Sequence, residues 1–185
     1  MTLEISMEIV IKTKKEMIEK IKSGDVFIYP TDTVYGLGCD ATNAHSVQRI
    51  KDIKCSDHPF SVIAPSLEWI DKNLTVSHVE FLKRLPGPYT LIMKKKKPGD
   101  MIWVSENDKL GIRIPMHPFT DIIQASGKPF VTTSLNISGK KVLTDLKDLT
   151  KSMVESVDVI IDAGLLNNPS SEIFDLSGAN IKKIR

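Results

Sequence analysis

The pattern of apolar and polar positions predicts helices and strands in alternation along the chain. At the first clear helix, Thr13-Lys-Lys-Glu16 has the form of a capping box, and Met17 and Ile21 follow on one helical face before Gly24. Short runs rich in β-branched and aromatic residues, such as Val26–Tyr29, indicate strands. The spacing of apolar residues thus changes repeatedly between the helical period and the strand period.

The remaining predicted elements rest on the same signals. Further helices are predicted over 44–53 behind the cap Asn43, over 77–82 behind a second capping box, over 118–126 and over 146–153. Further strands are predicted over 7–11, 60–64, 89–93, 110–114, 130–133 and 157–161, with a terminal hairpin of 173–176 and 181–184. This alternation favours an α/β (α+β) fold with a mixed sheet, in a single domain that spans residues 1–185.

Composition and charge narrow the class of protein. The 185 residues are 41% apolar and 26% charged, which is ordinary for a soluble globular protein, and the net charge of +2 excludes nucleic-acid binding by charge alone. No apolar run approaches the roughly 20 residues of a membrane span, and no signal-peptide pattern opens the chain. The two cysteines have no metal or redox spacing, so reduced thiols and a cytoplasmic location are expected.

Polar side chains gather directly after the strand predicted at Val26–Tyr29. Thr31, Asp32, Thr33 and Tyr35 lie between that strand and a glycine turn predicted at Gly36-Leu-Gly38. Hydroxyl and carboxylate groups next to a buried strand are costly to leave unpaired. Two interpretations follow, the floor of a ligand site or an ordinary strand, polar turn and second strand, and local reasoning does not separate them.

Two further polar clusters lie at predicted strand ends, where open α/β sheets place their ligands. Thr132-Thr-Ser-Leu-Asn-Ile-Ser-Gly139 follows an apolar run and offers neutral donors, although an ordinary Ser/Asn-rich turn has the same composition. Gly111-Ile-Arg-Ile-Pro115 places Arg113 inside an apolar strand. A buried arginine needs a partner, so an anionic ligand and a structural salt bridge are both consistent with this position.

Other candidate motifs are weaker. Lys54 follows the second predicted helix and either points toward the same region or complements the helix dipole. Gly36-x-Gly38 is too short for a dinucleotide fingerprint, and no Walker-type loop is present. The basic run Lys94–Lys97 is typical of a solvated loop, with contact to RNA phosphates as the alternative. The four histidines have no metal-ligand spacing, so no metal site is predicted.

Five motifs occur in an order that resembles the YrdC-type threonylcarbamoyl-AMP synthase family, over roughly residues 10 to 185. They are Tyr29-Pro-Thr-Asp-Thr-Val-Tyr-Gly-Leu-Gly38, Pro86-Gly-Pro88 with Thr90, Gly111-Ile-Arg-Ile-Pro115, Thr133-Ser-Leu-Asn-Ile-Ser-Gly139 and Asn168-Pro-Ser-Ser-Glu-Ile-Phe-Asp175. The additional C-terminal domain of some members is not found, so the chain resembles the short, single-domain form.

The resemblance implies a fold and a reaction. Members of this family have a twisted mixed sheet with flanking helices around a large, basic cavity. They form threonylcarbamoyl-AMP and pyrophosphate from L-threonine, bicarbonate or CO2, and ATP, with Mg²⁺ accompanying the nucleotide. A tRNA-modifying threonylcarbamoyl transferase complex then uses the product. A carbamate that attacks phosphorus needs no protein nucleophile, so positioning and charge stabilisation are expected to supply most of the catalysis.

The resemblance also implies residue roles at the amino-acid end of the site. Thr33 would contact L-threonine, and Tyr35 would shape the same pocket. Arg113 would pair with the substrate carboxylate, which gives the arginine in an apolar strand a partner. Ser134 and Ser171 would complete the L-threonine site.

At the nucleotide end the resemblance implies a second set of residues. Ser134 and Asn136 would bind the carbamate and the phosphates, and Arg185 would reach the nucleotide. Lys54 matches the lysine of a lysine-x-arginine motif and is predicted, with Ser134 and Asn136, to be catalytic. Direct RNA binding is a further expectation for the basic cavity, and no membrane partner is expected.

This sequence departs from the family pattern in two places. The chain reads Lys54-Cys55-Ser56, so the arginine expected two residues after Lys54 is missing, and Leu135 replaces a small residue between Ser134 and Asn136. A guanidinium fork that pairs with phosphate is not copied by a lysine. Two alternative hypotheses therefore stand beside the synthase: a catalytically weak member that binds nucleotide or RNA, and a carbamoyl-transfer relative, which the missing acylphosphatase-like and zinc-finger segments disfavour.

Overall fold

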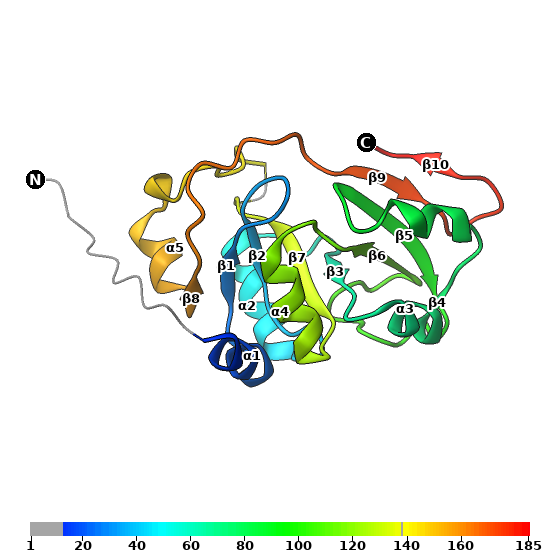
Figure 1. Ribbon diagram of the computed structural model, residues 1–185, viewed down its shortest axis with the longest axis horizontal. Helices are drawn as coiled ribbons and strands as arrows, with labels where there is room; N and C mark the ends of the chain where they lie inside the picture. Colours follow the sequence, from blue (N-terminus) through cyan, green and yellow to red (C-terminus); the bar gives the residue numbers. More distant parts are fainter. Residues whose placement is uncertain (1–12, 138) are drawn as a thin grey trace, which may run out of the picture.

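The computed structural model describes residues 13–137 and 139–185, in which ten strands form one twisted mixed sheet (Figure 1). The strands are β1 (Phe27–Tyr29), β2 (Gly36–Gly38), β3 (Ser61–Ile63), β4 (Leu74–Thr75), β5 (Tyr89–Lys95), β6 (Lys109–Arg113), β7 (Phe130–Ser134), β8 (Val159–Ile160), β9 (Glu172–Asp175) and β10 (Lys182–Lys183). The helices are α1 (Lys14–Ser23), α2 (Ala44–Lys54), α3 (Leu67–Asn73), α4 (Pro118–Ser126) and α5 (Lys151–Glu155), with the short 3-10 helices η1 (Val79–Arg84) and η2 (Leu146–Asp148). The strand predicted over 7–11 lies outside the described residues, so the assignment of all 185 residues to one domain stays a prediction.

The strand order brings distant segments of the chain side by side. Along the sheet the order is β10, β9, β5, β6, β3, β7, β2, β1 and β8, and β4 pairs with β5. The pairs β1 with β8, β3 with β6 and β5 with β9 are parallel, and the others are antiparallel, so the sheet is mixed as predicted. The hairpin predicted at the end of the chain is confirmed as β9 and β10.

Helices α1 and α2 begin at the capping residues that the sequence indicates, and α1 also ends at the predicted glycine. At α1 the Thr13 amide donates to Glu16 Oε2 at 2.6 Å while the Glu16 amide donates to Thr13 Oγ1, which completes the capping box. Asn43 caps α2 by accepting from the Ser46 amide. Gly24 adopts a left-handed φ of 89° after α1, a conformation that glycine adopts without steric cost.

Elsewhere the structure differs from the prediction. Gly36–Gly38 is not a turn but the strand β2, because pairing with β1 and β7 satisfies its backbone groups. The helix predicted over 146–153 is wrong: Asp145 and Thr150 each cap a separate short helix, which interrupts a continuous one. The second capping box is also wrong, since η1 begins at Val79 without a side-chain cap. Helix α3, capped by Ser66, was not predicted because Ile70 is its one buried residue.

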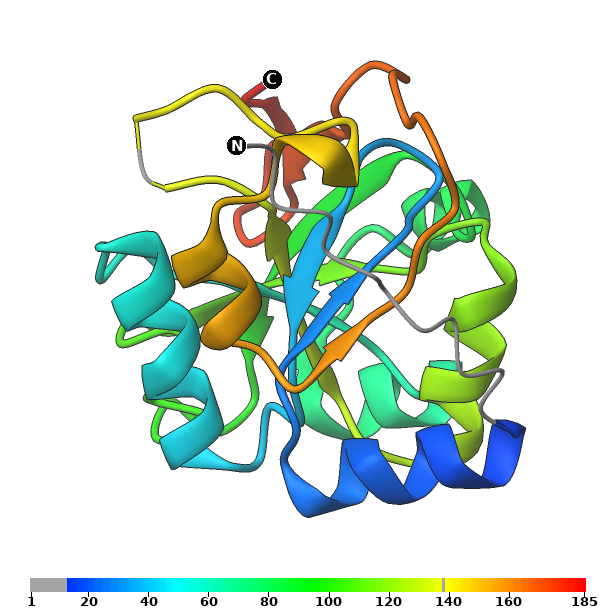
Figure 2. The same cartoon turned by 90° about the vertical axis from the view of Figure 1, so that its left-hand side faces the viewer.

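Strand β1 is buried on both of its faces, with helices packed around this part of the sheet (Figure 2). Phe27 and Tyr29 pack with residues of α1 and α4, while Val26 and Ile28 belong to the larger core, which includes residues of α2 and α3. Successive strand residues point to opposite faces, so a strand covered on both sides is apolar throughout. This explains the uninterrupted apolar run that precedes the polar cluster at Thr31.

The structure gives the state of the two cysteines and the length of the helices. Cys39 is buried and Cys55 is exposed, and both are free thiols. Among the helices of the described residues, none is long and apolar enough to cross a membrane. The cytoplasmic location stays a prediction.

Candidate functional site

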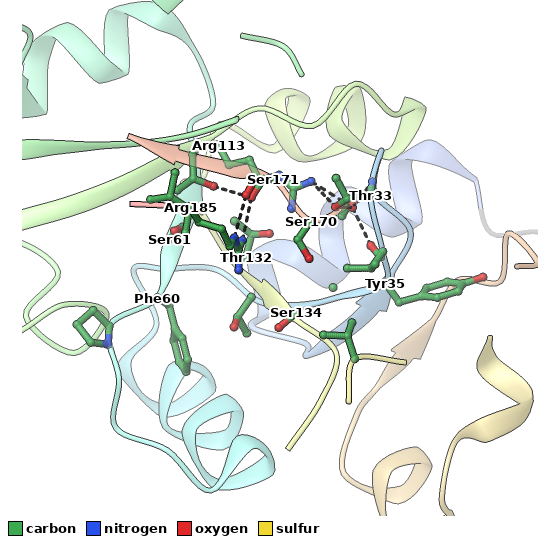
Figure 3. A pocket seen from close by; sticks show the side chains of 18 residues that line it. Thr33, Tyr35, Phe60, Ser61, Arg113, Thr132, Ser134, Ser170, Ser171 and Arg185 are labelled. Carbon is green, nitrogen blue, oxygen red and sulfur yellow. Dashed lines mark hydrogen bonds between the residues drawn. The ribbon is translucent and has the colours of Figure 1, made fainter. Parts of the chain in front are cut away.

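A cavity of about 210 Å³ opens beside the sheet, and hydroxyl groups make up most of its polar lining (Figure 3). Nine of its lining residues are serine or threonine and two are arginine, and none of the aspartate, glutamate or lysine residues in the described part of the chain lines it. These polar residues are Thr31, Thr33, Ser61, Thr90, Thr132, Thr133, Ser134, Ser170, Ser171, Arg113 and Arg185. A cavity with cations and neutral donors, and without carboxylates, suits an anionic ligand.

One face of β7 belongs to the apolar core at the start of the strand and to the cavity wall at its end. Phe130, Thr132 and Ser134 share one face of this strand, since they are two residues apart. Phe130 lies in the core formed with α1 and α4, whereas Thr132 and Ser134 line the cavity. At the boundary the buried Tyr29 hydroxyl donates to Thr132 Oγ1 at 2.6 Å, and burial raises the pKa of this phenol to about 12. The cavity therefore continues the small core on the same face of the sheet.

Arg113, at the end of β6, meets the loop that follows β1. Its Nη2 donates to Asp32 Oδ1 at 2.6 Å and to Thr33 Oγ1 at 2.7 Å, and the arginine is 9% exposed. The structural salt bridge that the sequence left open is thus present. Arg113 Nε, however, is buried without a hydrogen-bond partner among the described residues. Because an unpaired buried donor is costly, this side of the guanidinium is available to a ligand acceptor.

Asp32 holds three segments of the chain together. Besides the ion pair with Arg113, its Oδ2 accepts from the Met116 amide at 3.0 Å, and its carbonyl oxygen accepts from Asn168 Nδ2 at 3.0 Å. The loop after β1, the loop after β6 and the segment before β9 therefore meet at one residue, the first two through its carboxylate and the third through its backbone carbonyl oxygen. This arrangement fixes Arg113 next to the cavity.

The C-terminal strands bring a second arginine to the cavity. Arg185 Nε donates to the Ser171 carbonyl oxygen at 3.1 Å, and Nη2 lies 3.4 Å from Ser171 Oγ. Ser171 Oγ is also 3.1 Å from Thr90 Oγ1 on β5. Since β5 and β9 are parallel neighbours, their register places these hydroxyls and Arg185 together.

Tyr35 lines the cavity, but its phenol points away from the other labelled side chains (Figure 3). The hydroxyl accepts from the Ala163 amide at 2.8 Å and lies 2.7 Å from the Gly164 carbonyl oxygen. Burial raises the pKa of this phenol to about 12. Any contribution of Tyr35 to ligand binding therefore comes from the part of the residue near the backbone.

Lys54 and Asn136 lie behind the cavity and do not line it. The Lys54 ammonium donates to the Ser134 carbonyl oxygen at 2.7 Å, to Asn136 Oδ1 at 2.9 Å and to the Asn136 carbonyl oxygen at 3.0 Å. Ser134 Oγ donates to Asn136 Oδ1 at 2.6 Å. Burial lowers the pKa of the Lys54 ammonium to about 8. Of these three residues, Ser134 alone reaches the cavity.

The basic run Lys94–Lys97 is only partly a loop. Lys94 and Lys95 are the last residues of β5, and Lys95 is buried, with its ammonium donating to the carbonyl oxygens of Asp100 and Ser105. The prediction of a solvated loop is therefore wrong for these two residues, because Lys95 satisfies carbonyl groups of the following segment. RNA contact by the run stays a prediction.

Comparison with known proteins identifies the family. Residues 19–185 match the model of the Sua5/YciO/YrdC family, which is described as Telomere recombination. The chain belongs to the Sua5/YciO/YrdC family. This confirms the resemblance drawn from the five ordered motifs.

Individual family members agree in sequence and fold. A putative threonylcarbamoyl-AMP synthase of Methanocaldococcus jannaschii is 36% identical over 160 residues, which cover 82% of this chain and 75% of that protein. The structure of P. abyssi Sua5 complexed with L-threonine matches with a TM-score of 0.82 and 27% identity, over 94% of this chain and 54% of that one. E. coli YciO matches with a TM-score of 0.80 and 26% identity, over 94% of this chain and 89% of that one. The chain thus spans about half of the Sua5 chain and most of YciO, and the twisted mixed α/β fold is confirmed.

The structure brings most of the predicted site residues of this family member to one cavity. Lys54 and Asn136 do not line the cavity, but both form hydrogen bonds with Ser134, which does. The lining includes Thr33, Tyr35, Arg113, Ser134, Ser171 and Arg185. The roles of these residues stay predictions, and so does a large, basic cavity. Within the part of the chain that the structure describes, no group of three His, Cys, Asp or Glu side chains is arranged to hold a metal ion.

Sequence reasoning missed several residues of the site. Asp32 stood within the polar stretch after the first strand, so its position was a signal, but its partner Arg113 is 81 residues away. Thr132 stood at the start of the polar cluster after the strand predicted over 130–133 but was given no role, and Ser61 gave no signal, because it faces the cavity only through the pairing of β3 with β7. Pairing register is a long-range property that the local pattern does not reveal.

Proposed function

We propose that this protein is an L-threonylcarbamoyladenylate synthase, a nucleotidyltransferase that forms threonylcarbamoyl-AMP and pyrophosphate from L-threonine, bicarbonate or CO2, and ATP. The observation that carries the proposal is Arg113, held by Asp32 and Thr33 with its buried Nε unpaired, at a cavity lined by hydroxyl groups. A family member named as a putative threonylcarbamoyl-AMP synthase and a Sua5 complexed with L-threonine support the assignment.

The reaction requires positioning rather than a protein nucleophile. The amine nitrogen of L-threonine bonds to the carbon of CO2 and loses a proton, which gives a carbamate. A carbamate oxygen then bonds to the α-phosphorus of ATP while the bond from that phosphorus to the bridging oxygen breaks, and pyrophosphate leaves. Arg113 would orient the substrate carboxylate with Thr33, and Ser134 and Ser171 would donate to developing charge.

The nucleotide would bind toward Arg185 and the Ser134–Asn136 turn. No carboxylate side chain of the described residues lines the cavity, so Mg²⁺ would enter with ATP, bound to its phosphates, as part of the substrate. The family resemblance predicts a catalytic role for Lys54, Ser134 and Asn136, of which Ser134 lines the cavity. The product would pass to a tRNA-modifying threonylcarbamoyl transferase complex.

The test is the release of pyrophosphate by the purified protein with Mg²⁺ and ATP. We expect release that requires both L-threonine and bicarbonate, and a loss of at least about a hundredfold in Arg113→Gln, because a buried charge-assisted contact with the substrate disappears. Arg49→Gln is the matched control, since it removes an arginine–aspartate ion pair with Asp158 outside the cavity. No release by the wild-type protein, with its fold intact, would reject the proposal.

A second candidate function is a catalytically weak family member that binds nucleotide or RNA. The observation that favours it is the chain Lys54-Cys55-Ser56, which lacks the expected arginine, together with a Lys54 ammonium that is bonded to three protein oxygens. Salt-sensitive RNA binding without any pyrophosphate release would favour this candidate over the synthase.

A further inference from the structure

Lys54 reaches the candidate site from inside the protein. It is the last residue of α2, its exposed fraction is 7%, and the left-handed Cys55 follows it with φ of 47°. The three oxygens around its ammonium belong to Ser134 and Asn136, at distances between 2.7 and 3.0 Å. An ammonium has three donor hydrogens, so these contacts use all of them.

The Ser134–Asn136 turn supplies its own donors for two of these three oxygens, and the first is the Asn136 amide, which donates to the Ser134 carbonyl oxygen at 3.0 Å. Asn136 Oδ1 already accepts from Ser134 Oγ, and the Asn136 Nδ2 group donates away, to the carbonyl oxygens of Ile137 and Lys140. Two carbonyl oxygens and one amide oxygen thus converge at a part-buried point. Among the described residues, Lys54 is the one donor that these three oxygens share, and it is the partner of the Asn136 carbonyl oxygen, which no group of the turn satisfies.

The turn is tied to the protein on its other sides as well. The buried Leu135 donates its amide to the Tyr35 carbonyl oxygen at 2.9 Å, and Leu143 donates to the Leu135 carbonyl oxygen at 2.9 Å. The Lys54 ammonium holds one side of the turn and these backbone hydrogen bonds hold the other, and in this position Ser134 faces the cavity. The large Leu135, which departs from the family pattern, fills the core below this turn.

We propose that Lys54 is a positioning residue, a built-in cation that shapes the Ser134–Asn136 turn, and that it is not a ligand of nucleotide phosphates. For the nucleotide to recruit this ammonium, three hydrogen bonds would have to break and a buried side chain would have to turn outward. This inference deepens the proposed function, because it moves Lys54 from the reacting groups to the support of Ser134.

Hydrogen exchange of the ligand-free protein tests the inference without any reaction. In Lys54→Met we expect exchange of the Leu135 and Leu143 amides to accelerate by at least about tenfold, because the turn loses its central cation. The amide of Ile161, which donates to Ile28 in the distant β1–β8 pair, should keep its protection and thereby exclude global unfolding. Unchanged exchange at Leu135 and Leu143 would overturn the proposal.

Lys51→Met is the matched control. Lys51 lies on α2 one turn earlier and is also buried, and among the described residues its ammonium forms an ion pair with the exposed Asp57 alone, at 4.0 Å. The same lysine-to-methionine change there should leave the exchange of the Leu135 and Leu143 amides within about twofold of wild type. Equal acceleration in both variants would assign the effect to loss of a lysine in α2 and would overturn the proposal.

Acylation of lysines in the wild-type protein provides a test if Lys54→Met does not fold. We expect Lys54 to react at least about tenfold more slowly than the exposed Lys72, with or without Mg²⁺ and ATP, because its nitrogen is enclosed. A phosphate ligand would instead react readily in the free protein and become protected by ATP, and that result would overturn the proposal.

Nucleotide affinity and Lys54→Arg give a further distinction. A planar guanidinium does not match three oxygens around one nitrogen, so Lys54→Arg should fail to restore the Leu135 protection.

Nucleotide affinity of Lys54→Met separates the two roles. Loss of turn geometry should weaken AMP and ATP binding by the same factor, whereas loss of a ligand to the outer phosphates would weaken ATP binding alone. If the wild-type protein bound neither nucleotide, the proposed function would fail while exchange and acylation still tested the role of Lys54.

Discussion

At the scale of single residues, Arg113 shows how one guanidinium can serve the fold and a ligand together. Its Nη2 satisfies Asp32 and Thr33, while its buried Nε has no partner in the described chain. The sequence indicated that this arginine needs a partner, and both of the alternatives it left open are compatible with the geometry. The sequence did not reveal Asp32 as the partner, because the ion pair joins the loop after β1 to the end of β6, and these two residues are 81 positions apart in the chain.

Asp32→Asn tests the support of Arg113. The carboxylate accepts from Arg113 with one oxygen and from the Met116 amide with the other, whereas an asparagine has a single acceptor oxygen. The neutral side chain also removes the charge that pairs with the buried Arg113 guanidinium, and we expect the free energy of unfolding to fall by roughly 1–3 kcal/mol. Urea denaturation measures this change, and Asp121→Asn, at an exposed position of α4, is the control. Equal effects of the two substitutions would contradict the prediction.

At the scale of elements, local signals predicted the helices with strong caps and the strands with continuous apolar runs. Helices α1, α2 and α4 have a capping side chain, or proline at the first helical position, and all three were predicted. Helix α3 buries only Ile70, so it has no apolar stripe to recognise. The strand β2 was read as a turn because its glycines match turn chemistry, and only its pairing with β1 and β7 makes it a strand.

Gly38→Ala tests why β2 contains glycine. A Cβ at this position would collide with the Phe130 ring and with the Val131 carbonyl oxygen, and the backbone atom cannot move without disturbing β7. We expect a loss of about 1–3 kcal/mol in the free energy of unfolding, measured by urea denaturation. Gly99→Ala is the control, because a Cβ there meets no atom within 4 Å, and its effect should stay within about 0.5 kcal/mol. A Gly38→Ala protein as stable as the control would show that β7 adapts.

At the scale of the whole molecule, the cavity exists because the sheet brings five distant segments together. Thr33 follows β1, Arg113 ends β6, Ser134 ends β7, and Ser171 and Arg185 flank the C-terminal hairpin. No local pattern places β9 beside β5, so reasoning from separate motifs left each polar cluster ambiguous. The ordered set of family motifs was what indicated that they belong to one site.

The ion pair of Asp175 with Lys109 fastens the C-terminal hairpin to the sheet. Asp175 on β9 reaches across β5 to Lys109 on β6 at 3.0 Å, so the contact spans three strands. Burial by itself would raise the pKa of Asp175, but hydrogen bonds from Ser177 and the ion pair outweigh burial and lower the pKa to about 2. The folded protein therefore stabilises the ionised carboxylate more than the unfolded chain does.

The pH dependence of stability tests this attachment. Because the pKa of Asp175 is lowered on folding, its contribution is complete above pH 4 and is lost as the pH falls toward 2, with a total of roughly 2 kcal/mol. We expect Asp175→Asn to reduce the free energy of unfolding by about that amount at pH 7, measured by urea denaturation between pH 2 and 7, and the difference from wild type to shrink toward pH 2. Asp57→Asn, at a side chain that is 90% exposed, should leave the curve unchanged. A constant difference between wild type and Asp175→Asn over this range would show that the side chain acts through its shape and hydrogen bonds, not through its charge.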